Sequence, residues 1–159
     1  MHSFVQLFTF AINKTFIKMG SFRDLIVYKK AFDLSMAIFN ITKKFPPEEK
    51  YSLISQIRRS SRSVCTNLAE GYRKRQYAAH FVAKVSDADM ENTETSVWLD
   101  FSLACEYIDA DTFAFLKNTT IEIGRLLYDM MAFPEKYSLK KEINKKAPPD
   151  KDKPNNKKP

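Results

Sequence analysis

The sequence has very little glycine and histidine, and these shortages exclude several classes of protein. Its three glycines, Gly20, Gly71 and Gly124, are scattered, so no glycine-rich loop is present to cradle a phosphate group. A sheet-rich fold would also need more turn residues than these. The two histidines, His2 and His80, cannot supply the paired Glu-x-x-His motifs of a di-iron bundle. We therefore expect no cofactor and no bound metal.

Cysteine and long apolar runs are also scarce. Cys65 and Cys105 do not have the spacing of metal ligands, and one pair of cysteines is too few for a disulfide framework. This low cysteine content suits a reducing compartment, and we expect the protein in the cytoplasm. No run of about 18 apolar residues occurs, so we expect no membrane-spanning helix and no membrane partner. Ser60, Ser61 and Ser63 lack a nearby histidine base and a nucleophile-elbow sequence, so we expect no enzymatic activity.

Charge is abundant but unevenly distributed along the chain. The formal net charge is +7, yet residues 19–142 hold 18 basic and 17 acidic side chains. Within that part, residues 50–84 carry eight basic side chains and one acidic, whereas residues 85–142 carry five basic and twelve acidic. A basic segment followed by an acidic one can pair internally or between subunits, or it can leave one basic face for a polyanion.

The spacing of apolar residues predicts an all-α fold, an antiparallel up-down-up-down four-helix bundle. We expect helices near residues 23–44, 47–73, 77–107 and 110–133, with Asp109 as the N-cap of the last. Residues 21–134 would form the bundle, and residues 135–159 a basic, lysine- and proline-rich disordered tail. Residues 1–20 would be an N-terminal extension outside the core, with Met19 as the expected natural start.

Apolar stripes predict which face of each helix is buried. On the first helix, Leu34, Ile38 and Ile41 widen a main stripe, which consists of Leu25, Tyr28, Phe32, Met36 and Phe39. The second helix has a heptad-like seam, which consists of Ile54, Ile57, Ser61, Val64 and Leu68. The third has one face with polar residues midway, which consists of Phe81, Val85, Ala88, Asn92, Thr95 and Leu99.

The C-terminal end of the third helix is apolar nearly all round. Its main stripe is expected to consist of Val97, Phe101, Ala104, Cys105 and Ile108. A second apolar face is typical of a helix that contacts more than one neighbour, within the bundle or between subunits. The candidate oligomer interface is therefore this second face with the adjacent tryptophan: Trp98, Leu99, Leu103 and Tyr107.

The stretch "SQIRRSSRSVCTNLAEGY", residues 55–72, concentrates arginine on the second helix. Arginine suits the forked contacts that phosphate groups accept. The candidate nucleic-acid-binding residues are those that face away from the seam or follow it: Arg59, Arg62, Arg73, Lys74 and Arg75. The alternative is a solvated or salt-bridged outer face. On the third helix, Asp87, Glu91 and Glu94 share one face, and we expect them to pair with arginines of the preceding helix rather than to bind a metal.

Three blocks together resemble the four-helix-bundle family of 23S rRNA intervening-sequence proteins, which is related to the accessory subunit of diversity-generating retroelements. They are "FRDLIVYKKA", "FPPEEKYSLISQIRRSSRSVCTNLAEGY" and "FVAKVSDADMENTETSVWLDFSLACEYID". The resemblance covers residues 21–134. It implies an up-down-up-down bundle, a ring-like homopentamer and no enzymatic activity. The retroelement relatives bind a reverse transcriptase and nucleic acid through basic surfaces. Family arginines and glutamates correspond to Arg58, Arg59, Glu70 and Glu94.

Two hypotheses on function follow. The first is a non-catalytic oligomeric scaffold that binds RNA, DNA or a nucleic-acid enzyme such as a reverse transcriptase. The second is a protein-binding or self-assembling bundle with no nucleic-acid partner.

Overall fold

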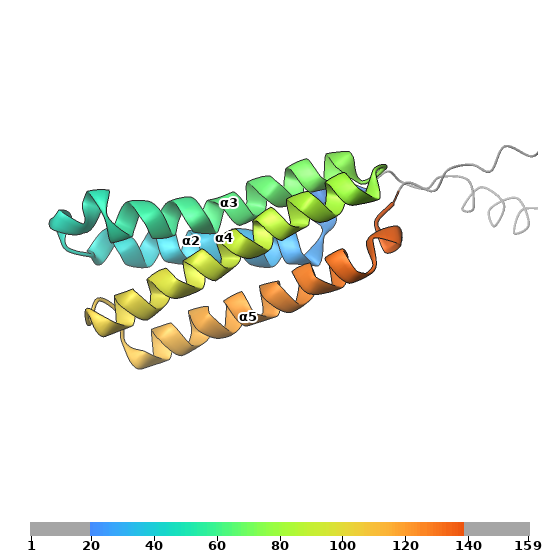
Figure 1. Ribbon diagram of the computed structural model, residues 1–159. Helices are drawn as coiled ribbons and strands as arrows, with labels where there is room; N and C mark the ends of the chain where they lie inside the picture. The colour runs from blue at the N-terminus through green and yellow to red at the C-terminus, as the bar shows by residue number, and fades with distance from the viewer. Residues whose placement is uncertain (1–19, 139–159) are drawn as a thin grey trace, which may run out of the picture.

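Four long helices lie side by side in the computed structural model, which describes residues 20–138 (Figure 1). They are α2 (Ile26–Ile41), α3 (Leu53–Lys74), α4 (Ala78–Ala104) and α5 (Ala110–Ala132). Four short 3-10 turns join or flank them: η1 (Phe22–Asp24), η2 (Thr42–Lys44), η3 (Pro47–Tyr51) and η4 (Pro134–Lys136). Residues 20–138 contain no strand, so the prediction of an all-α fold with four long helices is confirmed.

Local capping explains where the helices begin. The Asp109 carboxylate accepts a hydrogen bond of 2.6 Å from the Thr112 backbone N–H, which confirms Asp109 as the N-cap of α5. That bond holds the pKa of Asp109 below its ordinary value. The predicted second helix is divided, because Ser52 interrupts it between η3 and α3. There the Glu49 carboxylate accepts the Leu53 N–H at 3.2 Å and serves as a cap from within η3.

The core is centred on α3 and α4, which share the most extensive contact. Both predicted faces are confirmed, since every residue of the α3 seam and of the polar-centred α4 face is buried. Gly71 permits the close approach of the two helices, because a Cβ placed there would lie only 3.2 Å from the Cβ of Lys84. The α5 core residues are Leu116, Ile123, Leu127 and Met130.

The predicted main stripe of the first helix does not form the core. Phe32 is 48% exposed and Met36 is 41% exposed. The buried face of α2 lies beside this stripe and consists of Val27, Ala31, Leu34, Ser35 and Ile38, so Leu34 and Ile38, which were predicted to widen the stripe, are confirmed as core residues. Because the buried face contains alanine and serine, its side chains are less hydrophobic than those of the exposed face, which carries aromatic residues.

The predicted main stripe at the end of α4 is buried only at Ile108. Val97 and Phe101, expected in the main stripe, are 45% and 52% exposed. Leu99 is fully buried in the core of its own chain, and Leu103 and Tyr107 pack partly against that core. The predicted second face is therefore the continuation of the buried one.

Side chains at one end of the bundle extend the packing beyond residue 134. The Tyr72 hydroxyl donates a hydrogen bond to the Gly20 carbonyl, and the Tyr137 ring stacks on Phe81 with centroids 5.7 Å apart. The ordered region therefore includes Tyr137, which the sequence had assigned to the tail. The remaining residues of the predicted extension and tail, 1–19 and 139–159, lie outside the described region.

Candidate nucleic-acid-binding and self-association surfaces

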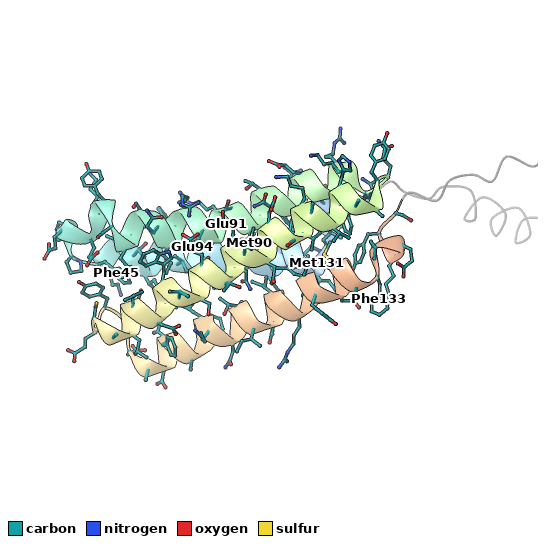
Figure 2. All side chains as sticks on the ribbon, in the orientation of Figure 1. Phe45, Met90, Glu91, Glu94, Met131 and Phe133 are labelled. Atoms are coloured by element: carbon teal, nitrogen blue, oxygen red, sulfur yellow. The ribbon has the colours of Figure 1, made fainter. Side chains whose placement is uncertain are left out.

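Arg59 is neutralised by two carboxylates of α4. One terminal nitrogen lies 2.7 and 2.9 Å from the two oxygens of Glu94, and the other lies 3.5 Å from Glu91. The Trp98 indole N–H also donates to Glu94, at 3.2 Å. Glu91 and Glu94 occupy the side of α4 that faces α3 (Figure 2). The carboxylates raise the pKa of Arg59, and its charge is largely compensated inside the chain.

Arg58 and Arg62 belong to a different surface, between α2 and α3. The Arg58 Nε donates to the Thr42 hydroxyl at 2.7 Å, and its guanidinium lies 4.9 Å from the Phe39 ring centroid. The guanidinium of Arg62 lies 5.6 Å from the same ring, and the Lys43 ammonium lies 4.5 Å from it. Three cations therefore surround one aromatic ring, and none of them has a carboxylate partner among residues 20–138.

Arg73, Lys74 and Arg75 lie together at the C-terminal end of α3 and form what we call the basic turn. Arg73 and Lys74 are exposed, while Arg75 stacks on the Tyr72 ring at 3.8 Å and donates to the Tyr72 carbonyl at 2.6 Å. No salt bridge to any of the three occurs within the described residues. Of the five candidate residues, the basic turn thus brings three together, while Arg59 and Arg62 lie elsewhere.

Ion pairs account for the acidic face of α4. The prediction that Glu91 and Glu94 pair with an arginine of the preceding helix is confirmed by Arg59. Asp87 differs, because it pairs at 3.2 Å with Lys84 of its own helix, which also bonds Glu70 of α3 at 2.9 Å. Among the described residues, no group of three or more potential metal-binding side chains is present.

A polar layer crosses the interior between the helices. The Thr95 hydroxyl lies 2.9 Å from the Ser60 hydroxyl, which joins α4 to α3. The Asn92 side-chain amide donates to the Thr120 carbonyl at 2.9 Å, which joins α4 to α5. These bonds are directional, so they favour one register between the three helices. The layer therefore helps to fix how α3, α4 and α5 pack against one another.

The four residues of the predicted oligomer interface face their own chain. Leu99 is inside the core, and Trp98 is half-buried and bonded to Glu94. The Tyr107 hydroxyl donates to Glu49 at 3.1 Å, and its ring lies 5.2 Å from that of Phe45. Leu103 packs against the core. Leu99 must be removed from the candidate interface because its side chain does not reach the surface.

The exposed apolar residues of α4 are Met90, Val97 and Phe101, which are 62%, 45% and 52% exposed. Sequence reasoning missed them as a surface because it assigned Val97 and Phe101 to the core. Their spacing of seven and four positions in the sequence could have identified this surface, because it places the three residues on one side of a helix, opposite the polar-centred face. No helix within residues 20–138 has the length and apolar character needed to cross a membrane.

Comparison with known proteins identifies relatives of the described region. A family model described as 23S rRNA-intervening sequence protein matches residues 23–129. A crystal structure of a protein of unknown function, from the S23 ribosomal protein family of Bacteroides thetaiotaomicron, is 30% identical with a TM-score of 0.61. The similarity covers 67% of this chain and 96% of that chain. No curated protein matches the chain significantly.

Proposed function

The chain belongs to the family of 23S rRNA-intervening sequence proteins, and from this we propose that it is a non-catalytic, self-associating helical bundle that binds nucleic acid or a nucleic-acid enzyme. The absence of catalytic chemistry is part of the proposal. It is supported by the environment of the α3 serines: the Ser60 and Ser61 hydroxyls bond to carbonyls of their own helix. We also propose a cytoplasmic location, which two free cysteines suit.

The basic turn is the observation that carries nucleic-acid binding. Arg73, Lys74 and Arg75 are adjacent in sequence, and no carboxylate within the described residues neutralises them. Unneutralised cations attract phosphate groups by releasing condensed counterions, with little dependence on base sequence. The basic turn therefore replaces Arg59 as the centre of the proposed surface.

We infer an antiparallel up-down-up-down order for the four helices. Contacts between helix ends support it: the end of α3 contacts the start of the described chain through Tyr72 and Gly20. The start of α4 contacts the region after α5 through Phe81 and Tyr137. The colour gradient along successive helices in Figure 1 agrees with this order. It would place the basic turn at one end of the bundle.

We further propose a homo-oligomer, with the pentamer that the family resemblance implies. Repetition matters because one basic turn supplies only three charges. Several copies held in one assembly could engage a single long RNA or DNA at the same time, and avidity would then raise the overall affinity.

A charge-matched pair of variants of the full-length chain tests the proposal. The first replaces Arg73, Lys74 and Arg75 with alanine, and the control replaces Lys145, Lys146 and Lys151, which also removes three positive charges. Binding of a structured RNA and a duplex DNA is measured at two salt concentrations. We expect the first variant to bind more weakly and the slope of log affinity against log salt to fall by about 2 to 3, roughly one per lost phosphate contact. Equal losses in both variants would show that bulk charge, rather than the basic turn, attracts the nucleic acid.

A second candidate function is a self-assembling or protein-binding scaffold with no nucleic-acid partner. The neutralisation of Arg59 by Glu94 favours it, because the family-matched arginine is already used within the chain. Self-association together with a failure to bind RNA and DNA at low salt would select this alternative.

A further inference from the structure

Two apolar stripes remain uncovered on the described chain. The α2 stripe consists of Tyr28, Phe32, Met36 and Phe39, of which Phe32 and Met36 are 48% and 41% exposed. The α4 stripe consists of Met90, Val97 and Phe101, and Figure 2 shows Met90 on the surface of α4. Each stripe spans eleven residue steps of one helix, or about 16 Å at a rise of about 1.5 Å per residue. The two stripes therefore match in length.

The α2 stripe is bordered by positive charge. Lys43, Arg58 and Arg62 surround Phe39, and a hollow of about 430 Å³ beside Tyr28 and Phe32 is lined by Arg23, Lys29 and one carboxylate, Asp33. None of these five cations forms a salt bridge within residues 20–138. Arg58 and Arg62 lie one helical turn apart, a like-charge spacing that destabilises a helix unless an anion compensates it.

The α4 stripe lies on a helix of the opposite charge. Between Ala78 and Ala104, α4 carries one lysine and five carboxylates: Asp87, Asp89, Glu91, Glu94 and Asp100. Cations of the same chain form salt bridges with four of these carboxylates. Arg59 is shared by two of them and Lys84 is shared with Glu70, so the cations are fewer than the carboxylates. The helix therefore retains a negative field beside its exposed apolar residues.

We propose that the α2 stripe of one copy packs against the α4 stripe of a second copy. The inference rests on the self-association proposed above and assigns it to two faces. Length, apolar character and charge are all complementary between the two stripes, and a second copy would cover both of them. The contact is heterologous, because it joins two different faces, so an open assembly keeps one free α2 stripe at one end and one free α4 stripe at the other until it closes.

Other occupants fit the α2 stripe less well. The chain's own ends both carry net positive charge, with two lysines and no acid in residues 1–18, and six lysines and two aspartates in residues 143–159. The cations that border the stripe would repel them. A nucleic acid would suit these cations, but it would leave the α4 stripe uncovered and would be repelled by its carboxylates.

Two face-specific variants of the full-length chain test the proposal. Met36→Asp places a carboxylate within the α2 stripe, and Val97→Asp places one within the α4 stripe. Both positions are more than two-fifths exposed, so each variant should fold, which circular dichroism checks. Tyr51→Asp is the control, because Tyr51 is 84% exposed and belongs to neither stripe.

Analytical ultracentrifugation then gives the size of each species. We expect the wild type and Tyr51→Asp to assemble, and Met36→Asp and Val97→Asp each to remain monomeric. When the two monomeric variants are mixed, the intact α4 stripe of the first should bind the intact α2 stripe of the second. The mixture should therefore form a heterodimer with one copy of each.

Each other outcome overturns a defined part of the inference. A monomeric wild type would overturn both the face assignment and the proposed self-association. A wild type that assembles while either variant still assembles fully would overturn the face assignment alone. Two monomeric variants that fail to pair on mixing would contradict a contact between the α2 stripe of one copy and the α4 stripe of another. Loss of RNA binding in Met36→Asp with assembly unchanged would assign the α2 stripe to nucleic acid.

Discussion

Arg59 and Arg62 are three positions apart on α3, yet their charges have different consequences. The guanidinium of Arg59 lies 2.7 Å from the Glu94 carboxylate, so a carboxylate of α4 neutralises most of its positive charge. The guanidinium of Arg62 lies over Phe39 at 5.6 Å, where the ring supplies only a weak quadrupole. Arginine content alone therefore does not define a polyanion site. The position of the nearest carboxylate decides which cations remain effective.

The two cysteines should differ strongly in reactivity. Cys65 is buried beside the α3 seam, and desolvation raises the pKa of its thiol to about 11, whereas Cys105 is exposed. At about pH 8, roughly one Cys65 thiol in a thousand would be a thiolate, which is the form that reacts with alkylating reagents. We expect iodoacetamide to modify Cys105 first, with the Cys65 rate rising about tenfold per pH unit until the pH nears 11.

Peptide mass spectrometry after timed alkylation measures both rates. In denaturant the two cysteines should react alike, which serves as the control for intrinsic reactivity. Comparable rates in the native protein would show that α3 opens readily at Cys65.

At the scale of the helix, α4 offers a direct test of which face is buried. Leu99→Ala should lower the free energy of unfolding by about 2 to 5 kcal/mol, because it leaves a cavity in a fully buried position. Val97→Ala should change that free energy by less than about 0.5 kcal/mol, since Val97 is exposed. Urea denaturation of both variants in the Met36→Asp background, which we expect to be monomeric, measures the difference. Similar losses for the two substitutions would mean that Val97 contributes to the core.

Two of the helix limits were predictable because local signals fix them. Pro46 and Pro47 end the first helical segment, and Asp109 begins the last with a capping bond that depends only on nearby residues. The buried faces of α2 and of the end of α4 were not predictable from apolar spacing. Their core sides contain Ala31, Ser35 and Ser102, while larger apolar side chains lie outside. Close helix packing selects small residues, so size and hydrophobicity give opposite signals there.

The candidate site was predictable only in part, for a related reason. A helical wheel places Arg59 and Arg62 outward, and both are exposed. The pairing of Glu94 with an arginine of the preceding helix was predicted, but the sequence does not show which one, and the structure identifies Arg59, 35 residues earlier in the chain. The basic turn was easier to predict, because three consecutive cations at a helix end leave no room for a carboxylate between them.

At the scale of the whole chain, the basic and acidic segments of the sequence form different helices of the structure. Residues 50–84, with eight basic side chains and one acidic, include all of α3, and residues 85–142, with five basic and twelve acidic, include most of α4 and all of α5. Salt bridges from Arg59 and Lys84 join α3 to α4 and neutralise part of this charge imbalance within the chain. The basic turn is also without a salt bridge among the described residues. The cations around Phe39 and the excess carboxylates of α4 are the other charges that the chain does not compensate. They would face one another if the α2 and α4 stripes of two copies meet.

The salt dependence of assembly should therefore have a definite sign. At about 0.1 M salt the Debye length is about 10 Å, so charges across a contact still interact, and at about 0.5 M this interaction is largely screened. An unlike-charge contact weakens as salt rises, whereas a contact between two like faces strengthens. We expect the dissociation constant of the wild-type assembly, measured by sedimentation equilibrium, to increase with salt. Arg62→Gln should reduce that increase, because it removes one border cation and keeps most of the side-chain volume. An assembly that strengthens with salt would contradict a contact between the α2 and α4 stripes.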